Sequence, residues 1–252
     1  MIQVLARTRG QAHLESLAVD VADEPERTRN WGVPIAGSVV AALLNDEDAL
    51  LAYEEDFQRP PYLAAPRAPI LYLRPANTWS AHREPIRIPA DLASLEVGAA
   101  LGLVIGRTAT RIGVHRALEH VAGYVVVNDL CAAHENVYRP AIRERCRDGF
   151  CAIGPWITPR AALGAPNGLV LRTHINGRLR AETTTTRLAR GPAELIAAIT
   201  DFMTLAAGDV LLLGPGADRP QARAGDSVRI EIPGVGSLEN TLIGAPPVEA
   251  AP

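Results

Sequence analysis

Residues 119–154 read EHVAGYVVVNDLCAAHENVYRPAIRERCRDGFCAIG, and this stretch says most about the fold. Its apolar run at 123–127 contains three successive valines, which predicts a buried strand that ends at Asn128 and Asp129. Acidic, basic and imidazole side chains crowd the next twenty residues. Because a strand fixes positions and a following loop supplies polar groups, such a junction is a common place for a functional site.

Strands outnumber helices along the rest of the chain. Apolar runs and alternation predict strands at 33–44, 69–73, 86–89, 99–106, 169–175, 210–213 and 228–232. Asn176-Gly177 is typical of a two-residue hairpin turn. Helical spacing and capping residues predict helices at 46–57, 114–121 and 192–205. Because the helices do not alternate regularly with strands, the sequence predicts a mainly-β α+β fold.

The sequence also suggests how the chain is divided. Residues 1–32 are mixed and turn-prone, which predicts an N-terminal extension or loosely packed arm. Residues 33–243 form the predicted domain, and 244–252, rich in Pro and Ala, a flexible tail.

Composition limits the classes of function. With 252 residues, 48% of them hydrophobic and 21% charged, the chain is typical of a globular protein. A net charge of -3 gives no reason to expect nucleic acid or an anionic membrane as a partner. No apolar run reaches the roughly 18–20 residues of a membrane span. Three cysteines without CxxC spacing favour free thiols in a reducing compartment, so we expect a cytoplasmic protein.

Several segments resemble one protein family. GYVVVND at 123–129 is similar to the G-Y-x-x-x-N-D signature of the fumarylacetoacetate hydrolase family. YRPAIRERCRDGFCAIG at 138–154, LGLVIGRTATRI at 101–112 and GDVLLLG at 208–214 narrow the resemblance. They are similar to the first of the two homologous halves or subunits of the isomerase/decarboxylases of homoprotocatechuate (4-hydroxyphenylacetate) degradation. The resemblance implies a mixed β-sheet roll of the fumarylacetoacetate hydrolase C-terminal-domain type, with its active site at the open mouth.

The resemblance also implies a metal site, which this sequence lacks in part. Active relatives hold Mg²⁺ with three carboxylates, a ligand set that suits a hard cation. Two of these come from an E-x-E motif whose positions here are Gly98 and Ala100, so only Asp129 remains. Glu96 is two residues early, and strand geometry places it about 7 Å from position 98. We therefore predict no metal and no other cofactor for this chain.

Other family positions have also changed. The H-x-x-E pair of the family's lid corresponds to Ala49 and Ala52. The G-T-P turn that closes over the substrate is Gly214-Pro215-Gly216, and two lysines of the family's site appear as Arg74 and Arg145. An arginine still pairs with a carboxylate through two parallel hydrogen bonds.

The remaining polar groups form the predicted site. We expect Arg74, Arg139, Arg145 and Gly214 to bind substrate, and His134, Glu135 and Asp129 to act as catalytic groups. A His beside a Glu is able to move a proton near neutral pH. The alternative is structural: His134 would be a surface loop residue, and Asp129 a strand-end cap or the partner of an arginine.

Three functions remain open. The first is an isomerase that shifts a proton in 5-carboxymethyl-2-hydroxymuconate and works with a metal-bearing decarboxylase subunit, because isomerisation needs acid/base groups but no metal. The second is a catalytically inactive structural subunit, and the third is an acylpyruvate-type hydrolase. The expected partners are a small dicarboxylate substrate and either a second copy of the chain or a homologous metal-bearing subunit.

Overall fold

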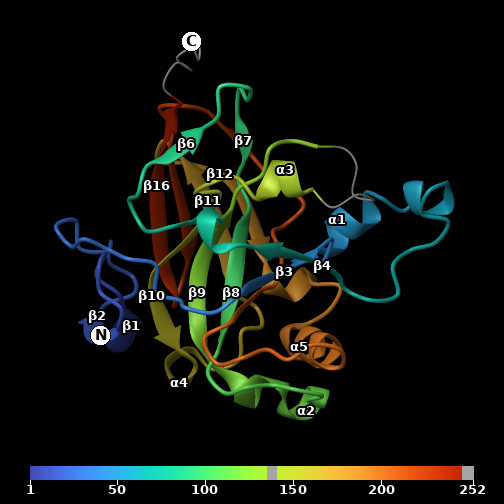
Figure 1. Cartoon of the computed structure of the whole chain (residues 1–252), viewed down its shortest axis with the longest axis horizontal. Helices are drawn as coiled ribbons and strands as arrows, with labels where there is room; N and C mark the ends of the chain where they lie inside the picture. The colour runs from blue at the N-terminus through green and yellow to red at the C-terminus, as the bar shows by residue number, and fades with distance from the viewer. Residues whose placement is uncertain (135–140, 246–252) are drawn as a thin grey trace, which may run out of the picture.

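The computed structural model describes residues 1–134 and 141–245, and these fold into two main β-sheets (Figure 1). The larger sheet has the order β2 (Glu15–Val19), β1 (Ile2–Ala6), β10 (Cys151–Pro159), β9 (Val121–Asp129), β8 (Ala99–Ile105), β13 (Val210–Leu212), β3 (Val39–Leu43) and β4 (Ile70–Arg74), and β5 (Trp79–Ser80) pairs with β10. The second has the order β12 (Arg178–Thr184), β11 (Val170–Ile175), β15 (Ser227–Ile232), β16 (Gly236–Gly244) and β6 (Ile86–Ile88). A short pair joins β14 (Gln221–Ala222) and β7 (Leu95–Glu96). Parallel pairs such as β13 with β3 lie among antiparallel ones, so the sheets are mixed, as predicted.

Strands β8 and β9 form the centre of the larger sheet, and every residue of β8 is buried. Leu101, Leu103 and Ile105 face the main core, which the second sheet and α5 (Pro192–Thr200) also line. Ala100 and Val104 belong to a separate apolar cluster on the opposite face. Because both faces are covered, this strand reads as a continuous apolar run without polar alternation.

The helices are short. α2 (Val114–Ala117) packs against α5 below the sheets, while α1 (Glu47–Leu51) and α3 (Ile142–Arg145) lie at the other end, beside β3 and β4 (Figure 1). Asp46 caps α1 by accepting a hydrogen bond from the backbone of Ala49. The predicted helix at 192–205 ends at Thr200, because Leu205 forms a two-way backbone pair with Ala109. The short helix α4 (Arg160–Leu163) follows β10.

The N-terminal segment is more firmly packed than the sequence predicted. Strands β1 and β2 form a hairpin, and Leu5 of β1 pairs with Ile157 of β10. Val4 and Ala6 are fully buried, and Trp31 packs edge to face against Trp156. The prediction of a loosely packed arm is therefore wrong for this segment, because its alternate apolar residues extend the larger sheet.

Candidate active site

The end of β9 carries a buried cluster of charges around Asp129. Arg74, from the end of β4, donates through Nε to Asp129 Oδ1 at 2.6 Å and through Nη2 to the Leu130 carbonyl at 2.5 Å. Its Nη1 donates to the backbone carbonyl of Arg145. Arg145, from α3, donates to Asp129 Oδ2 at 3.1 Å, and the Tyr72 hydroxyl donates to the same oxygen at 2.5 Å. Three side chains from two elements thus occupy both oxygens of the carboxylate.

These contacts determine the charge of Asp129. Burial alone would raise the pKa of its carboxyl group, but the positive charges of Arg74 and Arg145 and the hydrogen bond from Tyr72 outweigh it and hold the pKa below its usual value. The same burial and the neighbouring carboxylate raise the pKa of Tyr72, so the phenol keeps its proton. Asp129 is an anion that two guanidinium groups neutralise.

This arrangement does not fit a divalent cation. Both Asp129 oxygens already accept hydrogen bonds, and positions 98 and 100 offer no donor atom. Gly98 lies beside Asp129, and the backbone N–H of Asp129 donates a hydrogen bond of 2.8 Å to the carbonyl oxygen of Gly98. A Cβ at position 98 would come within 2.5 Å of the Asp129 carbonyl oxygen, so the backbone has closed over the space that a ligand side chain needs. Among the described residues no three His, Cys, Asp or Glu side chains gather as a metal site requires.

A pocket of about 270 Å³ lies next to this cluster. Its polar lining comprises Glu96, His134, Arg145 and Arg219. The remaining wall is apolar or aromatic and comes from the end of β3, from α1 with the residues after it, and from the loop before β14; it comprises Leu43, Leu44, Ala49, Ala52, Tyr53 and Ala217. The volume and the few converging polar groups suit a small organic anion. The pocket therefore brings two guanidinium groups, one imidazole and one carboxylate to a single cavity.

Two of the polar residues were missed as site residues by the sequence interpretation. Glu96 ends β7, and its carboxylate lies 3.7 Å from Nη1 of Arg219, which precedes β14. Both side chains are largely buried, with exposed fractions of 22% and 17%. Pairing of β7 with β14 brings these residues together although they are far apart in the sequence. Glu96 carried a signal, since it stands near the family's E-x-E motif, whereas nothing in the sequence marks Arg219.

The predicted site residues do not all meet in this pocket. His134 and Arg145 line it. Arg74 does not line the pocket. Its side chain is fully buried against Asp129, so it contacts the cluster and not the cavity. Glu135 and Arg139 lie outside the described residues.

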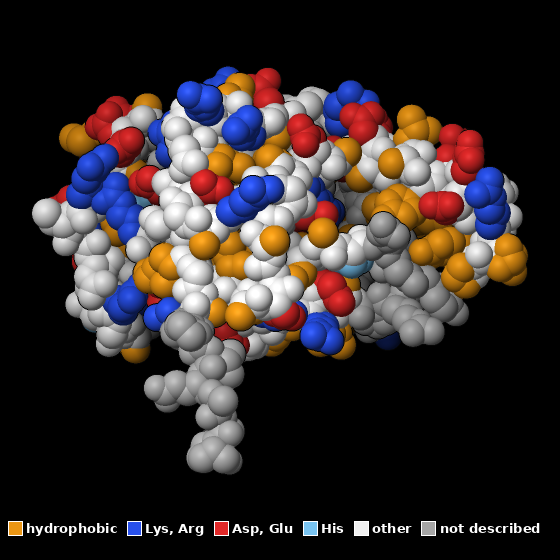
Figure 2. Space-filling view, turned by 90° about the horizontal axis from the view of Figure 1, so that it is seen from above, with side chains coloured by type: hydrophobic (Ala, Val, Ile, Leu, Met, Phe, Trp, Pro, Cys, Tyr) orange, Lys and Arg blue, Asp and Glu red, His pale blue; other side chains and the backbone are white. Residues whose placement is uncertain are grey.

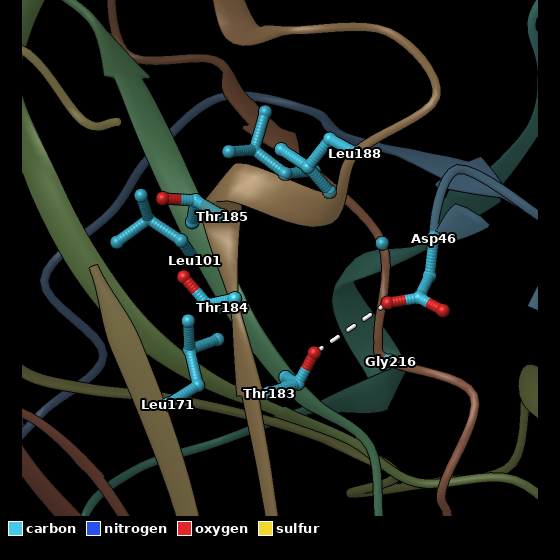
Figure 3. Close-up of a pocket in the computed structure, with 10 residues that line it drawn as sticks. Asp46, Leu101, Leu171, Thr183, Thr184, Thr185, Leu188 and Gly216 are labelled. Carbon is cyan, nitrogen blue, oxygen red and sulfur yellow. Dashed lines mark hydrogen bonds between the residues drawn. The ribbon is translucent and has the colours of Figure 1, made fainter. Parts of the chain in front are cut away.

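Gly214 lies outside this pocket as well, beside a much smaller cavity of about 10 Å³ (Figure 3). Asp46, Thr183 and Gly216 also line the small cavity, and Thr183 Oγ1 donates to Asp46 Oδ2 at 3.4 Å. That volume is at the lower limit for one water molecule. A Cβ at position 214 would lie 2.6 Å from the Ala42 carbonyl oxygen, so the turn needs glycine for close backbone packing.

Charged side chains of both signs are mixed on one face of the molecule (Figure 2). On the face seen in Figure 2, basic and acidic side chains are interspersed with apolar ones and neither sign dominates. No helix in the described part of the chain combines the length and the apolar character needed to cross a membrane.

Comparison with known proteins places these observations in a family. The model of the fumarylacetoacetate (FAA) hydrolase C-terminal family matches residues 38–243. The 4-hydroxyphenylacetate degradation bifunctional isomerase/decarboxylase of Salmonella dublin is 40% identical over 207 residues, which are 82% of this chain and 47% of that protein. The mitochondrial oxaloacetate tautomerase fahd2 of Xenopus laevis is 31% identical over 71% of this chain and 59% of its own length.

A solved structure shares the fold over nearly its whole length. The 5-carboxymethyl-2-hydroxymuconate delta-isomerase from Mycobacterium smegmatis superposes with a TM-score of 0.78 and 26% identity, covering 96% of this chain and 99% of that one. The present chain spans about half the length of the isomerase/decarboxylases it matches. These relatives are named as enzymes, so the comparisons give no support to the alternative of an inactive structural subunit.

Proposed function

Because the chain belongs to the fumarylacetoacetate hydrolase family, we propose that it is an isomerase that shifts a proton in 5-carboxymethyl-2-hydroxymuconate during 4-hydroxyphenylacetate catabolism. The observation that carries this proposal is the pocket itself, where His134 and Glu96 lie with Arg145 beside an Asp129 that arginines neutralise. Relatives named as isomerase/decarboxylases and as a delta-isomerase support the same reaction class.

The proposed reaction is a proton shift without electron transfer. The hydroxyl proton of the 2-hydroxydiene leaves, the oxygen becomes a ketone, and the far carbon of the conjugated system receives a proton. Each half of this shift needs one group that accepts or donates a proton. His134 and Glu96 are the titratable pocket residues that suit these roles, and Glu135, expected as a partner of His134, remains part of the proposal.

Arg145 is the residue that we assign to hold the substrate. Its Nη1 bonds Asp129, while its Nη2 is buried with no hydrogen-bond partner among the described residues. A buried donor without a partner is costly, and a substrate carboxylate or enolate oxygen would satisfy it. Asp129, Tyr72 and Arg74 then act as positioning residues, because they fix the guanidinium of Arg145 from behind.

Decarboxylation of the product builds enolate charge on a 2-oxo acid, a step that metal ions stabilise in many enzymes. Since the donor set here does not fit a divalent cation, we assign that step to a homologous metal-bearing half or subunit. The matched region covers 47% of the Salmonella dublin isomerase/decarboxylase, so that relative has a further part able to carry the second step.

The test is an isomerase assay on the purified chain alone, with and without a chelator. We expect the absorbance of the conjugated hydroxydiene to decay at the same rate in both, with no release of CO₂. His134→Asn should lower kcat by about 10²- to 10⁴-fold, as for loss of a general acid or base.

His115→Asn, at an exposed histidine on α2, is the matched control and should keep full activity. Turnover that appears only after addition of a metal-bearing partner, or that the chelator removes, would contradict the proposal.

A further inference from the structure

The pocket contains a second cation, Arg219, which neither the sequence interpretation nor the proposed roles above use. Arg145 comes from α3 and Arg219 from the loop between β13 and β14, so two independent elements each bring one guanidinium to the same cavity. Both side chains are largely buried, with 3% and 17% of their surface exposed. A guanidinium in such a place needs an anionic partner.

In the structure Arg219 is balanced by Glu96 but is not tightly bonded to it. Their nearest N···O distance is 3.7 Å, which exceeds a hydrogen bond. By contrast, Arg147 donates two hydrogen bonds of 2.9 Å to Asp91 at the surface. Glu96 thus supplies a negative charge near Arg219 but does not form the bidentate pair of hydrogen bonds that a carboxylate often makes with arginine.

The charges around the pocket leave room for an anionic ligand. Among the described residues, the three guanidinium groups of Arg74, Arg145 and Arg219 stand against the two carboxylates of Asp129 and Glu96, an excess of one positive charge. Arg74 is buried in the interior, where it bonds Asp129 and the backbone carbonyls of Leu130 and Arg145. The cationic groups that line the pocket are therefore Arg145 and Arg219, and each offers its own guanidinium to a ligand carboxylate.

We propose that Arg219 binds a second one of the substrate's three carboxylates and makes the pocket selective for dicarboxylates over monocarboxylates. Arg145 binds the first, and Glu96 holds the Arg219 guanidinium at the pocket in the free protein. This inference rests on the proposed function for the nature of the substrate. It assigns selectivity to a residue of the loop before β14.

Direct binding tests this without any turnover. Isothermal titration compares heptanedioate with heptanoate, two saturated probes of equal length that differ in one carboxylate. We expect the unmodified chain to bind heptanedioate at least tenfold more tightly. Arg219→Gln should weaken heptanedioate binding by about 10- to 100-fold, as for the loss of one charged hydrogen-bonding group. Heptanoate binding should change by less than about twofold, and Arg219→Lys should restore part of the preference, since it keeps the charge.

Arg223→Gln is the matched control, because Arg223 is an exposed arginine four residues further along. Thermal unfolding of each variant shows whether it is folded. Retention of the dicarboxylate preference in Arg219→Gln overturns the inference, and so does a loss of the same size in Arg223→Gln. Equal binding of the two probes by the unmodified chain, or no binding of heptanedioate at millimolar concentration, also overturns it. Isomerase turnover is measured separately, so failure of Arg219 as a selectivity residue and failure of the proposed function give different results.

Discussion

Asp129 shows how one residue changes its role when its neighbours change. In the family's pattern this carboxylate is one of three around a cation, whereas here Tyr72, Arg74 and Arg145 donate to it in the interior. Two guanidinium groups supply the positive charge beside it. Position 129 has the Asp of the family's signature, and its carboxylate here accepts hydrogen bonds from Arg74 and Arg145.

The first prediction concerns this buried ion cluster. Asp129→Asn removes the negative charge and leaves two buried guanidinium groups without a counter-charge, so we expect a loss of about 3–5 kcal/mol in the free energy of unfolding. Urea denaturation measures it. Asp91→Asn, which breaks a surface pair with Arg147, is the control and should cost far less. Equal losses for the two variants would contradict the prediction, because the buried ion cluster would then stabilise the fold no more than a surface ion pair does.

The second prediction concerns pH and His82. Burial, helped by the charge of Arg83, lowers the pKa of His82 to about 3, and its Nδ1 accepts a hydrogen bond from the backbone of Glu239. Between pH 3 and about 6.5 the unfolded chain therefore binds a proton that the folded chain does not. This group stabilises the fold above pH 6.5, and its contribution falls by roughly 1.4 kcal/mol for each pH unit below that.

Urea denaturation at a series of pH values checks the slope. His82→Gln should reduce the slope of the stability profile between pH 6.5 and 4, and the part that remains includes His174, whose pKa burial also lowers. Asp129, whose pKa is held below its usual value, loses its contribution at lower pH, as the pH falls from about 4 through the folded-state pKa. An unchanged slope between pH 6.5 and 4 in the variant would contradict the assignment to His82.

Among the elements, the β1–β2 hairpin departs most from the sequence prediction. It extends the larger sheet beyond β10 and buries Val4 and Ala6 against Trp31 and Trp156. Covering the edge of β10 protects its unpaired backbone groups. The N-terminal segment is thus part of the fold.

The third prediction tests this hairpin. Val4→Ala should lower the free energy of unfolding by roughly 1.5–3 kcal/mol, because Val4 is fully buried. Gln3→Ala, at the exposed neighbouring position, is the control and should change stability by about 0.5 kcal/mol or less. Equilibrium denaturation followed by tryptophan fluorescence, to which Trp31, Trp79 and Trp156 contribute, measures the loss. Equal stability of the two variants would indicate a loose arm.

For the whole molecule, the packing around β8 and β9 opposes the introduction of carboxylates at positions 98 and 100. Gly98 touches the Asp129 backbone, and a Cβ there would also lie 3.1 Å from Pro215 Cβ. Ala100 is fully buried in the apolar cluster behind the sheet. Carboxylate side chains at positions 98 and 100 would therefore require movement of the sheet, of the turn Gly214-Pro215-Gly216 and of the ion cluster around Asp129.

The fourth prediction follows from this packing. The double variant Gly98→Glu with Ala100→Glu should bind no Mg²⁺ at millimolar concentration by isothermal titration, and it should unfold at a lower temperature than the unmodified chain. Two buried charges without partners explain the loss. Ala93→Glu is the control. Ala93 is exposed and lies six residues before β8, so this variant should leave the unfolding temperature nearly unchanged. Tight Mg²⁺ binding by the double variant would show that the site needs only its ligands.

Much of the architecture could be predicted from local patterns. The apolar runs gave β8 and β9, and Asn176-Gly177 gave the β11–β12 hairpin, where both residues have positive φ. Strand β10 was not predicted, because Gly154 and Pro155 interrupt its apolar run, and the structure places a register shift there. The helices came out shorter than their periodicity suggested, because tertiary backbone pairs such as Leu205 with Ala109 end them.

The sequence by itself determined the family, the central strands and the absence of carboxylates at positions 98 and 100, since each of these can be read from residues close together in the chain. Only the tertiary structure decided where the remaining charges go. Arg74 and Tyr72 reach Asp129 across more than fifty residues, and Arg219 meets Glu96 through pairing of β14 with β7. Apolar periodicity is a local property of the chain, but compensation of a buried charge depends on whichever distant side chain the fold brings within reach.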